Sequence, residues 1–149
     1  MPTALAETAD PVQLAEALRP ALLRVSRRLR QESQKVGVSS TEALVLGQIK
    51  RKPGVGVCDL ADAEQISRPT MSSHVKRLEA AGWIARADHA QDGRRSGLAI
   101  TPAGEARLDQ IRRLRNDWLS ARLARLSPAE RESLGGASAL LIRLLEVAP

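Results

Sequence analysis

The fold of this chain is decided by one stretch, residues 65–104, which reads QISRPTMSSHVKRLEAAGWIARADHAQDGRRSGLAITPAG. The stretch opens with a short turn, and Ser67 stands where the N-cap of a helix is expected. Apolar residues then recur at helical spacing on one face, at Met71, Val75 and Leu78. Because Gly82 is a suitable residue to follow a helix, we predict a helix from residue 68 to residue 81.

Two short apolar runs follow this helix and predict a β-hairpin. Residues 83–86 and 98–101 are typical of short strands, and the segment between them is polar and contains glycine. Thr101 followed by Pro102 combines an N-cap residue with a proline at the first helical position. This signal predicts the longest helix of the chain, which we expect to reach about residue 126.

The segments on either side predict further helices. A helix from Asp10 carries an apolar stripe, and Pro20 inside it should kink or split the helix near residue 19. A capping box of Ser39 and Glu42 starts the next helix, and a short helix over residues 57–64 directly precedes the turn at 65–67. A second capping box, Ser127 and Glu130, starts a last helix that runs to about residue 146.

Composition limits the function classes. The chain has 149 residues, of which 43% are hydrophobic, so it can bury a core and we treat residues 1–149 as a single domain. Its aromatic residues are two tryptophans, too few for a module that stacks single-stranded bases. The formal net charge of +6 favours a polyanionic partner. With a single cysteine, no secretory signal and no apolar run of membrane-spanning length, we expect a cytoplasmic protein without a membrane partner.

The order of elements predicts a mainly α fold with a small β-hairpin wing, a winged helix-turn-helix joined to a helical dimerisation region. A helix fits the major groove of duplex DNA, and a neighbouring hairpin can place an arginine in the minor groove. The expected base-edge and nearby phosphate contacts lie in the helix from residue 68: Arg68, Thr70, Ser72, Ser73 and His74. We expect Lys76 and Arg77 to contact phosphates, and Arg94 and Arg95 to act from the wing.

Residues 39–104 resemble the DNA-binding half of the multiple-antibiotic-resistance regulator (MarR) family. The likeness is carried by LEAAGWIAR at residues 78–86, DGRR at 92–95 and LAITPAG at 98–104, with Ile100 where the family has leucine. The resemblance implies a DNA-binding lobe over residues 39–101 and helices over 10–35 and 102–147 that form a dimer interface. It also implies that Arg94 is the minor-groove arginine and that Asp92 orients it or its surroundings.

Apolar stripes in the first and last helices predict a homodimer, because one small winged helix cannot cover them. In the last two helices these are Leu108, Ile111, Leu114, Trp118, Leu134, Leu141, Leu144 and Leu145. Two-fold symmetry would match a pseudo-palindromic operator. We therefore expect a repressor of transcription, associated with the nucleoid through DNA, that a small-molecule effector releases. Since the chain lacks the Tyr and Phe that often line the family's crevice, we expect an apolar ligand or none.

Other functions leave weaker signals. No motif typical of an enzyme, a phosphate-binding glycine loop, a cofactor or a metal site occurs, so we expect no catalysis, cofactor or metal. A winged-helix interaction protein that does not bind DNA is the main alternative, although its wing would be more apolar than Asp92–Arg95. A redox-sensing regulator based on Cys58 is a further alternative, because Cys58 lies in the first turn of a predicted helix.

Overall fold

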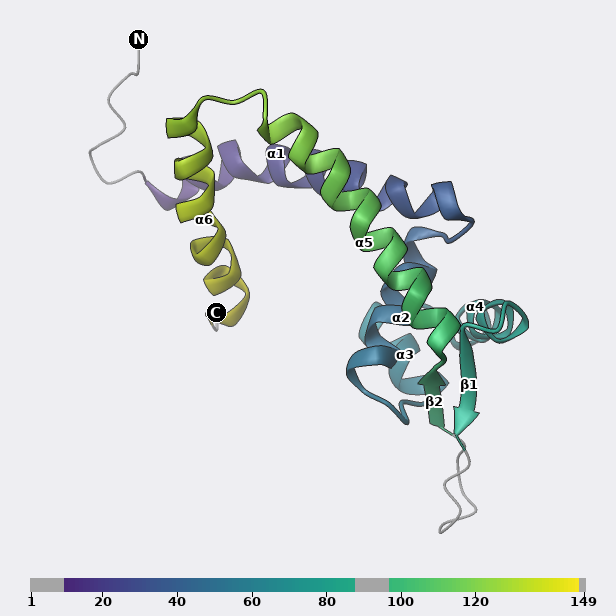
Figure 1. Cartoon of the computed structure of the whole chain (residues 1–149). Coiled ribbons are helices and arrows are strands. Elements are labelled where there is room, and N and C mark those ends of the chain that lie inside the picture. Colours follow the sequence, from purple (N-terminus) through teal and green to yellow (C-terminus); the bar gives the residue numbers. More distant parts are fainter. Residues whose placement is uncertain (1–9, 88–96, 148–149) are drawn as a thin grey trace. The chain divides into compact units, whose positions relative to one another are not determined.

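The computed structural model describes residues 10–87 and 97–147, and this part of the chain is mainly helical with an antiparallel hairpin (Figure 1). The predicted fold class is confirmed. In chain order the elements are α1 (Pro11–Gln31), the 3-10 helix η1 (Glu32–Val36), α2 (Ser40–Arg51), α3 (Val57–Glu64), α4 (Arg68–Ala80), β1 (Ile84–Ala87), β2 (Gly97–Ile100), α5 (Pro102–Leu123) and α6 (Pro128–Glu146).

The chain divides into two compact units, residues 1–115 and 116–149. The first unit holds α1 to β2 and the beginning of α5, and the second holds the end of α5 and α6. Within the first unit, α2, α3, α4 and the hairpin are the elements of the predicted winged helix-turn-helix (Figure 1).

The predicted helix starts are confirmed by their capping hydrogen bonds. Asp10 accepts a hydrogen bond from the backbone N–H of Gln13 at 3.3 Å. In the first capping box the Glu42 N–H donates to Ser39 Oγ at 3.1 Å, and the Ser39 N–H donates to Glu42 Oε2 at 3.0 Å. The second capping box, at Ser127, has the same two bonds. These bonds form within four residues, which is why the sequence alone predicts them.

The core lies in the first unit and joins the helix pair to the hairpin. Its buried side chains come from six elements, α2, α3, α4, β1, β2 and α5: Val45, Leu46, Ile49, Leu60, Met71, Val75, Leu78, Ile84, Leu98 and Ile111. Burying one such side chain stabilises the fold by about 1.5–3 kcal/mol. Three of them belong to α4, so this helix is held firmly with one face inward.

The hairpin is attached to the connection between α2 and α3. Ile84 pairs with Ile100, and the register continues to Ala87 opposite Gly97. Val55 forms an isolated bridge to Leu98, whose N–H donates to the Val55 carbonyl at 2.9 Å. A Cβ atom on Gly97 would lie 2.2 Å from the Gly54 carbonyl oxygen, so this close approach of two backbones requires glycine.

Two contacts from α5 reach the end of α1 and the end of η1. Arg115 donates from Nε to the Leu29 carbonyl oxygen at 3.1 Å, and burial lowers the pKa of this guanidinium. Arg107 donates from Nη1 to the Val36 carbonyl oxygen at 3.2 Å. These bonds fix the beginning of α5 against the rest of the first unit.

A buried carboxylate marks the start of η1. Glu32 is 1% exposed and forms ion pairs with Arg28 and Lys35. The hydrogen bond from Lys35, with Arg28 beside it, holds the pKa of Glu32 below its usual value although burial acts in the opposite direction. Neither η1 nor this buried charge was predicted from the sequence.

Several predicted boundaries were wrong by a few residues. The helix predicted to reach residue 81 ends at Ala80, and each strand is displaced by one residue, to Ile84–Ala87 and Gly97–Ile100. The helix predicted to reach residue 126 ends at Leu123, because the N–H groups of Arg125 and Leu126 donate to carbonyls three residues back instead of four. Terminal turns are where helix assignment is least certain from sequence.

Two other expectations need correction. Of the two outcomes expected at Pro20, a kink or a split, the split does not occur, because the first helix runs unbroken from Pro11 to Gln31. Because this part of α1 is exposed, water can satisfy the carbonyl that proline leaves without a donor. Ile111 was expected to face a second subunit, but it is 1% exposed within its own chain, and Leu108 packs against the same core.

Candidate nucleic-acid interface

The helix pair α3 and α4 has the geometry expected of a helix-turn-helix. Gln65 follows α3 with φ of 53°, a left-handed conformation that turns the chain. Ser67 then caps α4 through a hydrogen bond from the Thr70 N–H at 3.3 Å. Met71, Val75 and Leu78 face the core as predicted, which leaves the opposite face of α4 toward solvent.

The residues predicted to contact DNA in α4 lie on this outer face or at its margin. Arg68, Thr70, Ser73, Lys76 and Arg77 are exposed, whereas Ser72 and His74 are half-buried. The hydroxyls of Thr70 and Ser67 are 2.8 Å apart, and Ser73 donates to the Pro69 carbonyl at 3.1 Å. Among the described residues, Arg68 and Lys76 form no ion pair, so their charges are available to a polyanion.

His74 and Arg77 also face a buried carboxylate from α2. Glu42 is 1% exposed, and its Oε1 lies 3.2 Å from Arg77 Nε and 3.6 Å from His74 Nδ1. The side chain of Arg77 is nevertheless 68% exposed. The capping box of α2 is therefore linked directly to the outer face of α4, a link that sequence reasoning missed.

The C-terminal end of α4 is joined to the start of α5. Gly82 follows α4 with φ of 76°, and its carbonyl oxygen accepts a hydrogen bond from Thr101 Oγ1 at 2.6 Å. The Thr101 N–H donates to the Trp83 carbonyl oxygen at 3.0 Å. Gly104 lies so close to Trp83 that a Cβ atom would be 2.0 Å from that oxygen. We call this contact of Gly82, Trp83, Thr101 and Gly104 the helix-to-wing joint.

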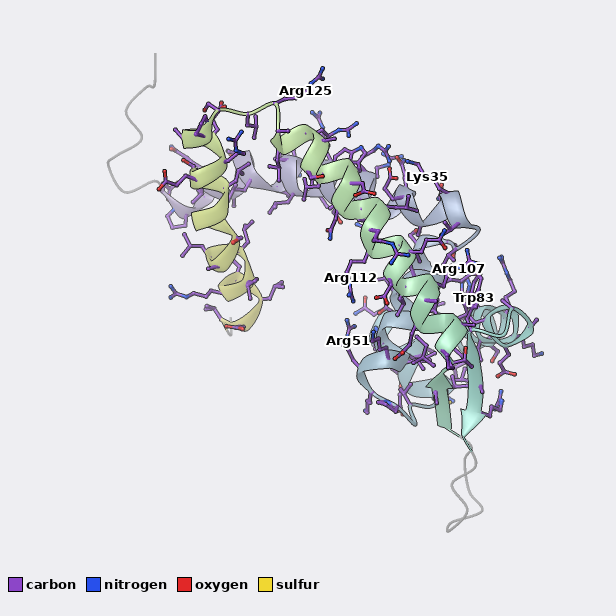
Figure 2. The ribbon with its side chains drawn as sticks, in the orientation of Figure 1. Lys35, Arg51, Trp83, Arg107, Arg112 and Arg125 are labelled. Atoms are coloured by element: carbon purple, nitrogen blue, oxygen red, sulfur yellow. The ribbon has the colours of Figure 1, made fainter. Side chains whose placement is uncertain are left out.

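Arg107 extends this joint to a third element. Its guanidinium carbon lies 4.9 Å from the centre of the Trp83 ring, and Figure 2 shows the two side chains next to each other at the beginning of α5. This is a cation–π contact. Since Arg107 also holds the Val36 carbonyl, one side chain connects α5, η1 and the turn after α4.

The base of the wing is fixed to α4 as well. Arg86 in β1 donates from Nε to Glu79 Oε1 at 3.1 Å. The wing-tip residues Asp92, Arg94 and Arg95 lie outside the described residues, so their roles stay predictions. The strands that carry the tip are in place next to the end of α4 (Figure 1).

Comparisons with known proteins agree with this geometry. Residues 36–95 match the sequence model of the MarR family. Over 137 residues the chain is 31% identical to an HTH-type transcriptional regulator of Mycobacterium bovis, an alignment that covers 92% of this chain and 96% of the relative. The chain belongs to the MarR family. It is therefore a DNA-binding winged helix-turn-helix protein of transcription regulation.

Solved structures of other MarR-like proteins share the fold. A proposed transcriptional regulator from Pseudomonas aeruginosa PA01 has a TM-score of 0.80 at 32% identity, and the match covers 93% of this chain and 96% of that one. A variant of MepR from Staphylococcus aureus, bound to an oligodeoxyribonucleotide, has a TM-score of 0.66 at 21% identity, with coverage of 89% and 97%. The second likeness concerns the fold alone.

A hollow of about 510 Å³ lies beside α1 in this MarR-family chain. It is lined by side chains of α1, η1 and their neighbours: Leu23, Arg27, Arg30, Gln31, Gln34 and Ser40. A second hollow of about 340 Å³ contains Cys58 at the start of α3, together with Arg86 and the close glycines Gly54 and Gly97. The Cys58 thiol is half-buried, and the redox hypothesis stays untested.

The described ranges contain neither a metal-ligand cluster nor a membrane-spanning helix. Within residues 10–87 and 97–147, no three His, Cys, Asp or Glu side chains are placed to hold a metal ion. Among the helices of those ranges, none is long and apolar enough to span a bilayer.

Proposed function

We propose that this chain is a homodimeric MarR-family repressor that binds a pseudo-palindromic DNA operator and is released by a small-molecule effector. The observation that carries the proposal is the division of α4 into two faces. Its inner face is buried through Met71, Val75 and Leu78, and its outer face presents exposed cationic side chains beside the hairpin. A helix anchored in this way can enter the major groove as a rigid body.

The contacts proposed for α4 and the wing follow from their chemistry. Hydroxyl, imidazole and guanidinium groups near the start of the helix suit base edges or adjacent phosphates: Arg68, Thr70, Ser72, Ser73 and His74. Lys76 and Arg77 lie farther along the same helix and suit phosphates. Arg94 would reach the minor groove from the wing, with Asp92 orienting it or its surroundings, and Arg95 would contact DNA from the same wing.

The dimer is supported by apolar side chains that the single chain leaves exposed. In α6 no residue is buried, and Leu144 and Leu145 are 63% and 88% exposed. In α1, Leu14, Leu22 and Leu23 are also exposed. Covering such side chains with a second copy would remove this apolar surface from water. Two-fold symmetry would then place two reading helices about one helical turn of DNA apart, roughly 34 Å.

The hollow beside α1 supplies the site we propose for an effector. The sequence alone favoured an apolar ligand, but this lining combines Leu23 with Arg27, Arg30 and amide or hydroxyl groups. Two guanidinium groups next to an aliphatic side chain suit a small organic anion with an apolar part. Such a ligand would act only by binding more tightly to the dimer shape that fits the operator poorly.

A repressor of this kind works at the chromosome, so we place it in the cytoplasm in association with the nucleoid. Its operator can be found by incubating the purified chain with fragments of the source genome and sequencing those it retains. Binding of the retained duplex is then measured by fluorescence anisotropy. We expect affinity to fall steeply with log[salt], because phosphate contacts release counterions.

The wing contact is tested in the same assay. We expect Arg94→Ala to weaken operator binding by about 1–3 kcal/mol while the mass of the dimer is unchanged. Arg19→Ala is the matched control, because it removes the same charge from the exposed surface of α1. Equal affinity of Arg94→Ala and the control would reject the minor-groove assignment, and a wild-type protein with no preference among genomic fragments would reject the proposed function.

A further inference from the structure

Glu42 has surroundings that a helix-capping residue does not require. Its Oε2 accepts the capping hydrogen bond from the Ser39 N–H at 3.0 Å. Its Oε1 is buried without a hydrogen bond among the described residues, and the side-chain nitrogens facing it there are Nε of the Arg77 guanidinium and Nδ1 of the His74 imidazole. Burying a carboxylate costs free energy unless a positive charge compensates it. The charge that compensates Glu42 comes from α4, the helix proposed to read DNA.

The second capping box of the chain makes the contrast clear. Ser127 and Glu130 form the same two local hydrogen bonds as Ser39 and Glu42. Glu130 is exposed, and the hydrogen bonds from Ser127 lower the pKa of its carboxyl, with no partner from another element among the described residues. Capping alone therefore does not require burial or an arginine, and the contact of Glu42 with α4 is a separate feature.

Arg77 can hold Glu42 and still contact another anion. A guanidinium has five N–H donors, of which Nε carries one. In this structure the Nε group faces Glu42, while the side chain is 68% exposed. The four donors on the two terminal nitrogens stay available, and a fixed guanidinium plane suits the bidentate recognition of a phosphate.

We propose that Glu42 is a positioning residue for DNA binding: its buried carboxylate fixes the Arg77 guanidinium so that its terminal nitrogens contact a backbone phosphate. The inference rests on the proposed function, since it assumes that α4 reads duplex DNA. Glu42 is anchored in turn by its neighbours in α2, because Ala43, Val45 and Leu46 belong to the core. The position of one phosphate contact is thereby set by the core of the lobe.

The substitution Glu42→Gln distinguishes positioning of the Arg77 guanidinium from an effect of net charge alone. Glutamine also serves at this position of a capping box, so the helix start is retained while the negative charge is lost. The substitution raises the net charge by one, and on charge alone it should tighten binding to DNA. Positioning predicts the opposite sign: about ten-fold weaker operator binding, the loss expected for a charge-assisted hydrogen bond. The sign of the change therefore decides between the two.

The measurement is fluorescence anisotropy with the operator duplex and with a random duplex of equal length, across a series of salt concentrations. For both Glu42→Gln and Arg77→Ala we expect the slope of log K against log[salt] to become shallower by about 0.9, the value for one lost phosphate contact. In the double variant, Glu42→Gln should add no further loss to Arg77→Ala, because the two residues act through one contact. Glu130→Gln, the matched capping-box control, should bind like the wild type.

Unchanged or tighter binding by Glu42→Gln, or losses that add in the double variant, would overturn the inference. Circular dichroism and thermal unfolding show whether Glu42→Gln is folded. If it is not, Arg77→Lys replaces it, because lysine keeps the charge but has no second nitrogen with which to hold Glu42 and a phosphate together. Operator affinity of Arg77→Lys equal to that of the wild type would also overturn the inference. If the wild-type protein binds no duplex at all, the proposed function fails and this inference fails with it.

Discussion

Replacing Gly104 by alanine tests how closely α5 approaches the end of α4. A Cβ atom at this position would lie 2.0 Å from the Trp83 carbonyl oxygen, 2.7 Å from Ile100 Cγ1 and 2.9 Å from the Trp83 carbonyl carbon. Two of these neighbours are backbone atoms, so a change of side-chain rotamer cannot relieve the clash. The Trp83 carbonyl also accepts the hydrogen bond from the Thr101 N–H at 3.0 Å, and a displaced carbonyl would weaken that bond.

Two opposing effects set the size of the change. In a helix, alanine is more favourable than glycine by about 0.5–1 kcal/mol, which alone would stabilise the variant. Overpacking at a tight contact destabilises by about 1–3 kcal/mol. Because the contact at Gly104 is so short, we expect the second effect to dominate and the variant to be less stable by about 2 kcal/mol. In a chain of this size that corresponds to a Tm lower by about 4–8 °C.

The assay is thermal and urea unfolding followed by helical circular dichroism, at one fixed protein concentration because the stability of the proposed dimer would depend on concentration. Gly135→Ala and Gly136→Ala are matched controls in α6, where an added Cβ atom meets nothing within 4 Å. These controls should gain about 0.5–1 kcal/mol each. If Gly104→Ala were as stable as the wild type or followed the controls, the close approach in the helix-to-wing joint would not constrain the fold, and the reasoning would be wrong.

Two further substitutions test the dimer and the buried charge. Leu145→Asp, at a side chain that is 88% exposed in the single chain, should leave each subunit folded but weaken dimerisation about a thousand-fold, since two copies lose their burial. Sedimentation equilibrium measures this, and a dimer as tight as the wild type would exclude Leu145 from the interface. Glu32→Gln should be less stable than the wild type at neutral pH, because the lowered pKa of Glu32 stabilises the fold above the unfolded-state pKa. The difference should shrink below about pH 4, as the folded-state carboxyl protonates, and a difference that is constant with pH would contradict this account.

The parts of this fold that the sequence predicts well are those decided by neighbouring residues. Ser39, Ser67 and Ser127 cap their helices as expected, because each bond spans three residues. The inner face of α4 was equally predictable, since a spacing of three or four residues places side chains on one side of a helix. The strand ends were less predictable, because they depend on hydrogen bonds between segments. The last turn of α5 was less predictable because its local bonds span three residues instead of four, a choice that the apolar spacing does not determine.

The contacts that organise the candidate interface could not be predicted from local sequence patterns. Glu42 was identified as a capping residue, but its pairing with Arg77 joins positions far apart in the chain. Ile111 was assigned to a dimer stripe because its spacing shows which face of the helix is apolar. Spacing does not show whether the same chain or a second copy covers that face, and here the same chain covers it. Arg107 and Gly104 gave no sign of their contacts with Trp83, which exist only once α5 has packed beside the turn after α4.

The stacking of Arg107 on Trp83 also gives the molecule an optical reporter. With two tryptophans and no tyrosine, ultraviolet emission from this chain comes from Trp83 and Trp118 alone. Replacing Trp118 by phenylalanine would leave a single fluorophore, Trp83, placed between the end of α4 and the beginning of α5. Changes in the emission wavelength or anisotropy of Trp83 would then report movements of the contact between α4 and α5 in solution, without an attached dye.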